Sequence, residues 1–365
     1  MDQQVLADAV ERGKAVQDRF ETLRYTRLVD TVGGYPRGSV VIDDGIVVPG
    51  YPSIGRVQSL AAGLERHFDD AFWAEEKIDG FNVRIVRHGD DLYAFSRGGF
   101  VCPFSTDRLP DLVDPAILDD EPGLVLCAEI AGPENPYLEG CPPDIKEDVA
   151  LFIFDMMDTT SGHFLHQEHR MSRLDYYALP AARIFGRYRP MDVQPLRELI
   201  LELDARGSEG LVFKAERDDV RAKYVTGRSN IVDIALCGDQ LLDLPPEYFT
   251  NRLMRLALFA SEHQQMGDAA LERQLGQAFL EGVGRAINRS REYGRVGIPF
   301  RCRFRRRRNA ELFMAHMKAT GGRRVHIAED MPCWEDGYWR LEFERELERM
   351  TGTLANTLSG GAQFD

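Results

Sequence analysis

Strand-like segments fill the middle of the chain and helix-like segments fill its last third, and this change of pattern limits the possible folds. Between residue 72 and about residue 226, short apolar runs alternate with turn residues, and one helical pattern near residues 196–203 ends at Gly207. The runs are FWAEEKI, FNVRIVRHGDDLYAFSR, LVLCAEI, VALFIFDMM and GLVFKAE. Runs of strands with occasional helices predict an antiparallel α+β domain with a cleft.

The flanking segments have different patterns. Residues 1 to about 30 carry a helical pattern, and VVIDDGIVV alternates around Asp44-Gly45, which is a strong hairpin signal. After residue 230 we expect helices at 247–263, 269–287, 310–320 and 335–350, with one arginine-rich strand between them. Because 365 residues exceed what one core usually serves, we predict three domains. They are a small N-terminal α+β module at 1–65, a cleft domain at 66–235 and a mainly helical domain at 236–365.

The charge balance restricts where a nucleic acid could bind. The formal charge is -14, whereas proteins coated in nucleic acid usually have a basic surface. The segment RCRFRRRR at 301–308 would place Arg301, Arg303, Arg305 and Arg307 on one side of a strand. This is either a nucleic-acid patch or a set of ion pairs.

No run approaches the ~20 apolar residues of a membrane span, so we expect no membrane contact and a cytoplasmic location.

The lysines are few. There are only six, against 39 arginines, and a persisting lysine indicates a need for a reactive amine or a compact charge. Lys77, in EEKIDG, ends a predicted strand before an Asp-Gly turn. A nucleophilic lysine near neutral pH needs its pKa lowered by roughly 3 units, about 4 kcal/mol. Neighbouring cations and a bound metal could lower it; the available cations are Lys214, Lys223, Arg84 and Arg97.

Six motifs in order carry a resemblance to a known family: EKIDGFN, SRGG, CAEIAGP, FIFD, SEGLVFK and VRAKYVT. KxDG alone is weak evidence, because most such lysines lie on the surface beside a turn. The ordered set resembles the covalent nucleotidyltransferase superfamily of ligases and capping enzymes, and within it the archaeal-type homodimeric ATP-dependent RNA ligase family. The resemblance implies an ATP-grasp-like ligase domain of antiparallel sheets at 66–235 and a C-terminal domain for dimerisation and RNA contact.

The resemblance also implies a reaction. Lys77 would attack the ATP α-phosphate, release pyrophosphate and hold AMP. The AMP would move to an RNA 5′-phosphate, and a single-stranded 3′-hydroxyl end would then displace it, in RNA repair or circularisation. Asn82 stands where RNA ligases usually carry asparagine and DNA ligases arginine. The implied cofactors are ATP and Mg²⁺ or Mn²⁺.

The remaining roles follow residue by residue from the same resemblance. Arg97 would contact ribose and the substrate phosphate, Glu129 the ribose hydroxyls, and Phe154 would stack on adenine. Glu209 would engage the metal. Lys214 and Lys223 would neutralise phosphates, as phosphoryl transfer requires. The expected catalytic residues are Lys77, Glu209 and Lys223; the expected ATP-binding residues are Glu76, Asn82, Arg97, Glu129, Phe154 and Lys214.

Several alternatives stay open. The family often has a second lysine two positions after Lys223, where this chain has Val225, and Arg221 or Arg228 is available as a substitute. Phe154 by itself could be strand core, Glu129 could cap a sheet edge, and Arg84 could face solvent or substrate. The rival functions are a DNA ligase, an RNA capping guanylyltransferase, and a non-catalytic RNA-binding protein. Capping enzymes and DNA ligases usually append a β-barrel where this chain becomes helical.

Overall fold

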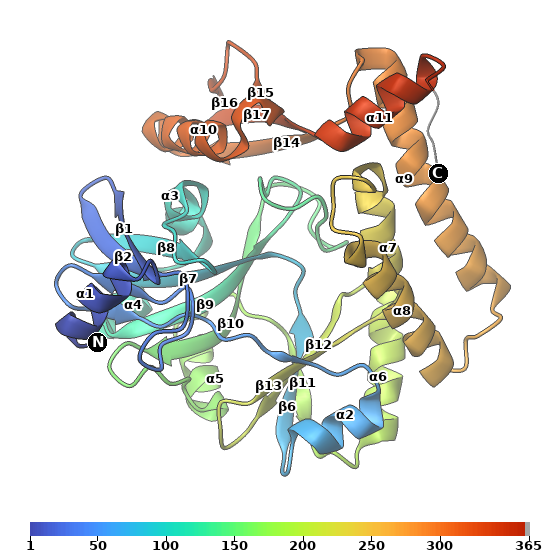
Figure 1. The fold of residues 1–365 in the computed structure, drawn as a ribbon. Helices are drawn as coiled ribbons and strands as arrows, with labels where there is room; N and C mark the ends of the chain where they lie inside the picture. Colours follow the sequence, from blue (N-terminus) through green and yellow to red (C-terminus); the bar gives the residue numbers. More distant parts are fainter. Residues whose placement is uncertain (362–365) are drawn as a thin grey trace.

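Two sheets form the centre of the molecule (Figure 1). In this computed structural model, which describes residues 1–361, the strand orders are β10-β9-β7-β8 and β11-β6-β12-β13-β5. All pairings are antiparallel except β13 with β5. The bounds of these strands are β5 (Gly55–Arg56), β6 (Phe72–Lys77), β7 (Phe81–His88), β8 (Asp91–Ser96), β9 (Leu124–Ala131), β10 (Ala150–Asp158), β11 (Ile184–Tyr188), β12 (Gly210–Ala215) and β13 (Arg221–Val225). The α+β fold with antiparallel sheets is therefore confirmed.

Helices cover the second of these sheets on its outer face. Helices α2 (Leu60–His67) and α6 (Val193–Arg206) bury leucines and isoleucine against Phe72 and Phe213. Helix α6 ends at Gly207, whose φ of +81° suits glycine. The sequence did not predict α3 (Pro103–Leu112), α4 (Ala116–Asp120) or α5 (Gln167–Tyr176).

The N-terminal module is a four-stranded sheet with one short helix. It comprises α1 (Gln3–Glu11), β1 (Ala15–Phe20), β2 (Leu23–Leu28), β3 (Val40–Ile42) and β4 (Val47–Val48). The hairpin around Gly45 is confirmed. The helical pattern up to residue 30 was wrong beyond residue 11, because Phe20, Leu23 and Tyr25 pack as strand residues against β3 and the central sheet. The domain limits at 65 and 235 stay predictions.

The C-terminal region combines helices with a small antiparallel sheet. Its elements are α7 (Gly227–Cys237), η1 (Gly238–Gln240), α8 (Glu247–Glu262), α9 (Ala269–Tyr293), β14 (Gly297–Phe304), α10 (Arg307–Gly321), η2 (Gly322–Arg324), β15 (Val325–Ile327), β16 (Cys333–Glu335), β17 (Tyr338–Glu346) and α11 (Glu348–Leu358). The expected helix at 335–350 was wrong. Asp336 and Gly337 both have positive φ and form a hairpin turn, and Leu341 and Phe343 alternate into the core.

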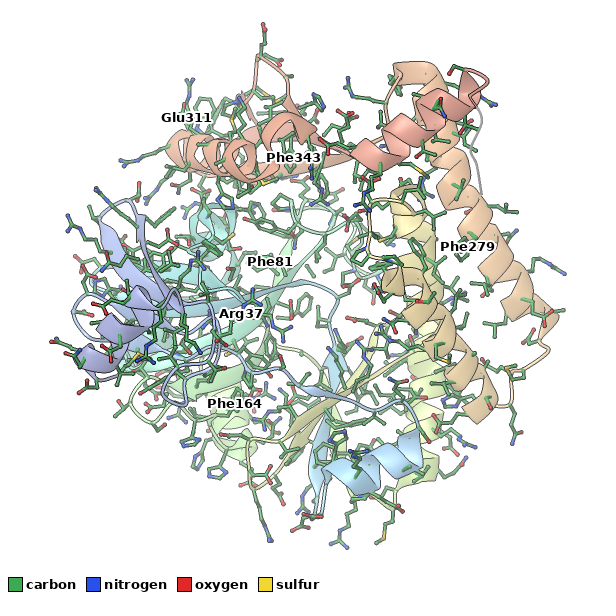
Figure 2. All side chains as sticks on the ribbon, viewed as in Figure 1. Arg37, Phe81, Phe164, Phe279, Glu311 and Phe343 are labelled. Carbon is green, nitrogen blue, oxygen red and sulfur yellow. The ribbon has the colours of Figure 1, made fainter. Side chains whose placement is uncertain are left out.

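One hydrophobic core joins the central sheet β10-β9-β7-β8 to the C-terminal sheet. Phe104 meets Phe304 edge-on at 5.6 Å between ring centroids, and Tyr137 meets Phe313 at 5.9 Å. Phe343, labelled in Figure 2, lies on the C-terminal side of this contact, and Phe81 lies on the central side. The C-terminal sheet is therefore packed directly onto the domain that carries the cleft.

The arginine-rich strand forms part of that contact. Arg303 donates two hydrogen bonds of 2.6 and 2.5 Å to the buried carboxylate of Glu134. Other arginines of the segment pair with Asp111, Glu311 and Glu21. Of the two interpretations of this segment, the ion-pair interpretation is the one that these contacts support.

Candidate active site

A cleft of about 660 Å³, part of it open to solvent, lies between the two central sheets. Most of its walls come from β6, β7, β9, β10, β12 and β13, with the 51–54 segment on one side. Glu209 does not line the cleft itself but contacts Lys77, which does. The other expected site residues line it: Glu76, Lys77, Asn82, Arg97, Glu129, Phe154, Lys214 and Lys223. Residues spread over almost 150 positions of sequence thus meet at one site.

Lys77 ends β6 and is held by an ion pair. Its Nζ lies 2.6 Å from Oε2 of Glu209, and their side chains are 19% and 18% exposed. The pairing of β6 with β12 sets this contact, because Lys77 lies opposite Gly210, the residue after Glu209. Burial alone would lower the pKa of Lys77, but Glu209, Glu129 and Asp79 outweigh it and raise that pKa. The expectation that neighbouring cations lower it was wrong for this state, since carboxylates surround the amine.

Two further carboxyl groups near Lys77 hold protons more tightly than usual. Burial, with repulsion from Glu209, raises the pKa of Asp79 to about 7. Burial raises that of Glu129 to about 8 despite the attraction of Lys77. Gly80 is required beside Glu129, since a Cβ there would lie 3.0 Å from the Glu129 Cβ and from the Ile130 carbonyl oxygen. The Asp-Gly turn thus brings the carboxyl group of Asp79 close to Lys77, in addition to those of Glu209 and Glu129.

Asn82 and Glu129 present unused acceptors. The Asn82 amide donates to Oε1 of Glu129 at 3.4 Å, across the pair of β7 and β9. Asn82 Oδ1 and Glu129 Oε2 are buried and have no hydrogen-bond partner within residues 1–361. Unpaired buried acceptors are costly, typically by about 1–3 kcal/mol. They are suited to a bound molecule with hydroxyl or amino donors, or to a cation.

A network of buried charges lies beneath the cleft and joins its two sheets. Lys214 Nζ lies 2.8 Å from Oε2 of Glu75 and 3.6 Å from Oδ2 of Asp155. Arg170 pairs with Glu75, and Arg221 pairs with Asp155 at 3.2 Å. Burial and the charge of Arg170 lower the pKa of Lys214. Lys214 thus has two carboxylate partners already, so its main visible role is to hold the sheets together.

Phe154 projects from the same network toward the cleft. Its carbonyl oxygen accepts hydrogen bonds from Lys214 and Arg170, and its ring meets Tyr51 edge-on at 5.2 Å. Tyr51 also donates to Asp155 at 3.1 Å. The ring is therefore fixed from behind while it lines the cleft.

The cleft mouth carries two cations without carboxylate partners. Neither Arg97, exposed after β8, nor Lys223, half-buried on β13, has an ion pair in the part of the chain that the structure describes. Burial, with repulsion from Arg56 and Lys77, lowers the pKa of Lys223 to about 8. Of the two candidate substitutes for a second motif lysine, Arg221 is used by Asp155 and Arg228 donates to the Ala205 carbonyl oxygen.

Arg84 neither faces solvent nor lines the cleft, so both alternatives considered from the sequence were wrong. It is fully buried and donates to the carbonyl oxygens of Pro49 and Ser96. It therefore ties the N-terminal module to the SRGG turn. Gly38 supports this junction, since a Cβ there would lie 2.1 Å from the Arg97 carbonyl oxygen.

Comparisons with known proteins agree with this geometry. The family model RNA ligase matches residues 70–225, and the model for the Ligase Pab1020 C-terminal region matches residues 239–361. A solved structure from Aquifex aeolicus, provisionally named an ATP-dependent DNA ligase, is 41% identical with a TM-score of 0.93, and each chain covers 100% of the other. The solved structure "Archaeal ATP-dependent RNA ligase - form 1" is 27% identical with a TM-score of 0.86, over 98% of this chain and 96% of that one. The chain belongs to the archaeal-type ATP-dependent RNA ligase family. Among curated proteins, an uncharacterized protein of Methanocaldococcus jannaschii is 27% identical over 83% of this chain and 79% of its own length.

Membership in this RNA ligase family makes the protein an ATP-dependent nucleic-acid ligase.

The cleft residues suit a divalent metal only in part. Within residues 1–361 no group of three or more His, Cys, Asp or Glu side chains is arranged for a metal ion. Mg²⁺ usually takes one or two carboxylates and completes its shell with water and substrate phosphates. Glu129, with its unpaired Oε2, and Glu209 are donors of that kind.

Some residues of the ligase cleft were not expected from the sequence. Tyr51, Pro52 and Ile54 precede the first motif yet line the cleft, and none of the six ordered motifs includes them. The sequence indicates Asp79 only as part of the Asp-Gly turn, and not as a carboxyl group close to Lys77.

Among the described residues no helix is long and apolar enough to cross a membrane.

Proposed function

We propose that this ligase seals RNA ends through a covalent lysyl-AMP intermediate on Lys77. The observation that carries the proposal is the pairing of Lys77 with Glu209 at the wall of a cleft lined by the other expected nucleotide-binding residues. A buried lysine with a carboxylate at 2.6 Å has both the nucleophile and the base that phosphoramidate formation needs.

In the first step Glu209 takes a proton from the Lys77 ammonium. The Nζ lone pair attacks the α-phosphorus, a P–N bond forms, the bond from that phosphorus to the bridging oxygen breaks, and pyrophosphate leaves with the electron pair. A second proton leaves Nζ for the solvent, so the lysyl-AMP nitrogen keeps one hydrogen. Lys223 and Arg97 supply positive charge at the cleft mouth, where charge accumulates on phosphate oxygens. Asn82 and Glu129, whose buried acceptors lack partners, are suited to the ribose hydroxyls.

The next two steps use the same cleft. An oxygen of an RNA 5′-phosphate attacks the phosphorus of lysyl-AMP, a P–O bond forms and the P–N bond breaks. Nζ takes one proton from Glu209 and one from the solvent, which restores the Lys77 ammonium. A 3′-hydroxyl then attacks the 5′-phosphorus of the adenylylated strand and loses its proton to the solvent. A phosphodiester P–O bond forms, the bond from that phosphorus to the bridging oxygen breaks, and AMP leaves. A divalent metal, held by Glu129 and Glu209 with phosphate oxygens, would neutralise charge on the phosphates.

RNA is favoured over DNA by Asn82. Its neutral amide contacts Glu129 on the cleft wall, whereas the arginine usual in DNA ligases would add a guanidinium there. A DNA ligase is the second candidate, and the name carried by the 41% identical Aquifex aeolicus structure favours it. The C-terminal region combines helices with a small sheet of β14, β15, β16 and β17, whereas capping enzymes and DNA ligases usually append a β-barrel at this point of the chain.

The test is incubation with magnesium and either α-labelled ATP or α-labelled GTP, followed by denaturing electrophoresis and by addition of 5′-phosphorylated RNA or DNA strands. Label from ATP that moves to RNA at least tenfold faster than to DNA supports the proposal. Equal or faster transfer to DNA replaces it with the DNA ligase, and label from GTP replaces it with capping chemistry. A folded, AMP-free preparation that takes no label supports a non-catalytic binding protein.

The proposal includes a homodimer. Met254 on α8 and Leu280 on α9 are 61% and 78% exposed, and Leu258 and Tyr293 add to the apolar surface of the same helices. A second copy of the chain is the occupant that the family resemblance implies. Light scattering should give twice the chain mass for the wild type and a lower mass for Leu280→Glu; a monomeric wild type would contradict the dimer.

A further inference from the structure

Arg84 is a buried cation that the proposed reaction does not use. It lies on β7 between Phe95 of β8 and Cys127 of β9, and its side chain is fully buried. Burial lowers the pKa of Arg84 to about 10, so the guanidinium stays charged at neutral pH. In the described part of the chain it makes no ion pair, and its buried Nε has no hydrogen-bond partner. A buried charge without a carboxylate partner disfavours folding, which indicates a role other than stability.

The two hydrogen bonds of Arg84 join two segments that line the cleft. Nη1 donates to the Pro49 carbonyl oxygen at 2.6 Å, and Nη2 donates to the Ser96 carbonyl oxygen at 2.7 Å. The first carbonyl directly precedes the segment that contributes Tyr51 to the cleft wall, and the second directly precedes Arg97. Because the donors of a guanidinium lie in one rigid plane, a single side chain sets the spacing between these two segments.

The segment that contains Pro49 is anchored to the N-terminal module. Residues 49–54 lie outside the strands. The Gly50 amide donates to Oγ of Ser39 at 2.8 Å. A Cβ on Gly50 would lie 2.6 Å from the carbonyl oxygen of Arg37, which is labelled in Figure 2, so the two backbones are in direct contact. The Pro49 carbonyl group is therefore a fixed point for the buried guanidinium.

The turn that carries Arg97 is held from the same side. The Ser96 carbonyl oxygen accepts hydrogen bonds from Arg84 and from the Gly99 amide, the latter at 2.9 Å. The Arg97 carbonyl oxygen packs against Gly38 of the N-terminal module. The side chain of Arg97 lines the cleft and has no ion pair among residues 1–361. Since no carboxylate orients this long side chain, its backbone contacts are what place it.

We propose that Arg84 is a positioning residue that holds Arg97 in place for the reacting phosphates. The inference rests on the ligase function proposed above, in which Arg97 supplies positive charge at the cleft mouth. Arg84 itself does not line the cleft; it acts through the Ser96 carbonyl group, with the Pro49 carbonyl group as its anchor. The N-terminal module thus contributes to the chemical step by fixing an arginine of the cleft domain.

The test is a double-mutant cycle on the single-turnover rate of protein labelling by saturating α-labelled ATP. Arg84→Met removes both hydrogen bonds and keeps an unbranched side chain, and Arg97→Gln removes the charge that they position. The rate is measured for the wild type, for each single variant and for the double variant. A residue that acts through Arg97 loses its effect once Arg97 is replaced, whereas independent effects multiply.

We expect Arg84→Met to slow labelling at least about tenfold in the wild-type background but less than about threefold in the Arg97→Gln background, because a misplacement of ~1 Å can cost about 100-fold in rate. Arg84→Lys keeps the cation but replaces the planar fork by one ammonium group, so it should also be slow. Equal slowing by Arg84→Met in both backgrounds would overturn the inference. So would a wild-type rate for Arg84→Lys, since charge alone would then suffice.

Arg108→Met is the matched control. Arg108 is also a buried arginine, but it pairs with Asp111 and Asp148, and none of the three lines the cleft. The folded control should label at the wild-type rate in both backgrounds. Thermal unfolding shows which variants are folded, and Arg84→Lys takes the place of Arg84→Met in the cycle if the latter is not. A wild type that takes no label would refute the ligase function itself, which is a separate outcome.

Discussion

The Nζ of Lys77 lies 2.6 Å from Oε2 of Glu209, and this ion pair raises the pKa of the amine that should act as the nucleophile. The cleft without nucleotide thus holds Lys77 as an ammonium ion. Entry of ATP phosphates, or of a cation that binds Glu209, would compete for this carboxylate. The resting pair therefore keeps the amine in position and protonated until a substrate enters.

Replacement of Lys77 by arginine tests the nucleophile while keeping the charge. Lys77→Arg retains a cation beside Glu209, but a guanidinium is not deprotonated in proteins. We expect no covalent label from α-labelled ATP, and a free energy of unfolding within about 0.5 kcal/mol of wild type. Denaturing electrophoresis and urea unfolding measure the two quantities. Label on Lys77→Arg at the wild-type level would place the nucleophile elsewhere.

Glu209→Gln should shift the pH dependence of labelling. Loss of the carboxylate removes the attraction that raises the pKa of Lys77, so the free amine appears at lower pH. We expect the maximal rate to fall, because the base is lost, and the inflection of the rate against pH to move down by about one unit. Single-turnover labelling from pH 6 to 10 measures this. An unmoved inflection would mean that Glu209 does not control the protonation of Lys77.

Lys223→Arg should remove a pH dependence of ATP affinity. The pKa of Lys223 is lowered to about 8, so above pH 8 the free wild-type enzyme loses a positive charge at the cleft mouth. The KM for ATP should rise several-fold between pH 7.5 and 9.5, since the charged form binds phosphate more tightly. Arginine stays charged over this range, so the KM of Lys223→Arg should be nearly constant. An equal rise in both proteins would assign the effect to another group.

The central strands and the cleft could be predicted from sequence because their signals are local. The apolar runs of β6, β9, β10 and β12 are bounded by turn residues, and the motif residues lie on strands, or directly beside them, that meet in the folded sheets. The ordered motifs identified residues that lie at the cleft without any geometric input.

What the sequence could not give is the partner of each charge. Lys214 and Arg221 looked free to bind phosphate, but they pair with Glu75 and Asp155 from distant strands. Arg56 was not expected beside Lys223, because only the pairing of β5 with β13 brings the two together. The expected helix at 335–350 failed for a different reason: the Asp336-Gly337 turn is a hairpin signal that outweighed the helical spacing around it.

Glu129→Gln should stabilise the ligand-free protein at high pH. Burial raises the pKa of Glu129 to about 8, above the ~4.3 of an unfolded chain, so the folded protein binds more protons between these values. The contribution to stability is then present at low pH and lost as pH rises through about 8. Because glutamine cannot ionise, the variant should gain at least about 1 kcal/mol over wild type between pH 5 and 9. Urea unfolding across this range measures the difference, and a pH-independent difference would contradict the buried, protonated carboxyl group.

Arg303→Ala distinguishes the two roles considered for the arginine-rich strand. Arg303 donates two hydrogen bonds to Glu134, which is 2% exposed, so its removal leaves a buried carboxylate with only the exposed Arg301 at 3.1 Å. Breaking such a pair should cost about 1–3 kcal/mol of unfolding free energy. Arg306→Ala is the matched control, because its exposed side chain has no partner among residues 1–361. We expect Arg303→Ala to lose stability while its RNA affinity and the salt dependence of binding stay those of the control. If this strand bound the phosphate backbone instead, the slope of log affinity against log salt would fall by about one for each arginine removed, with little change in stability.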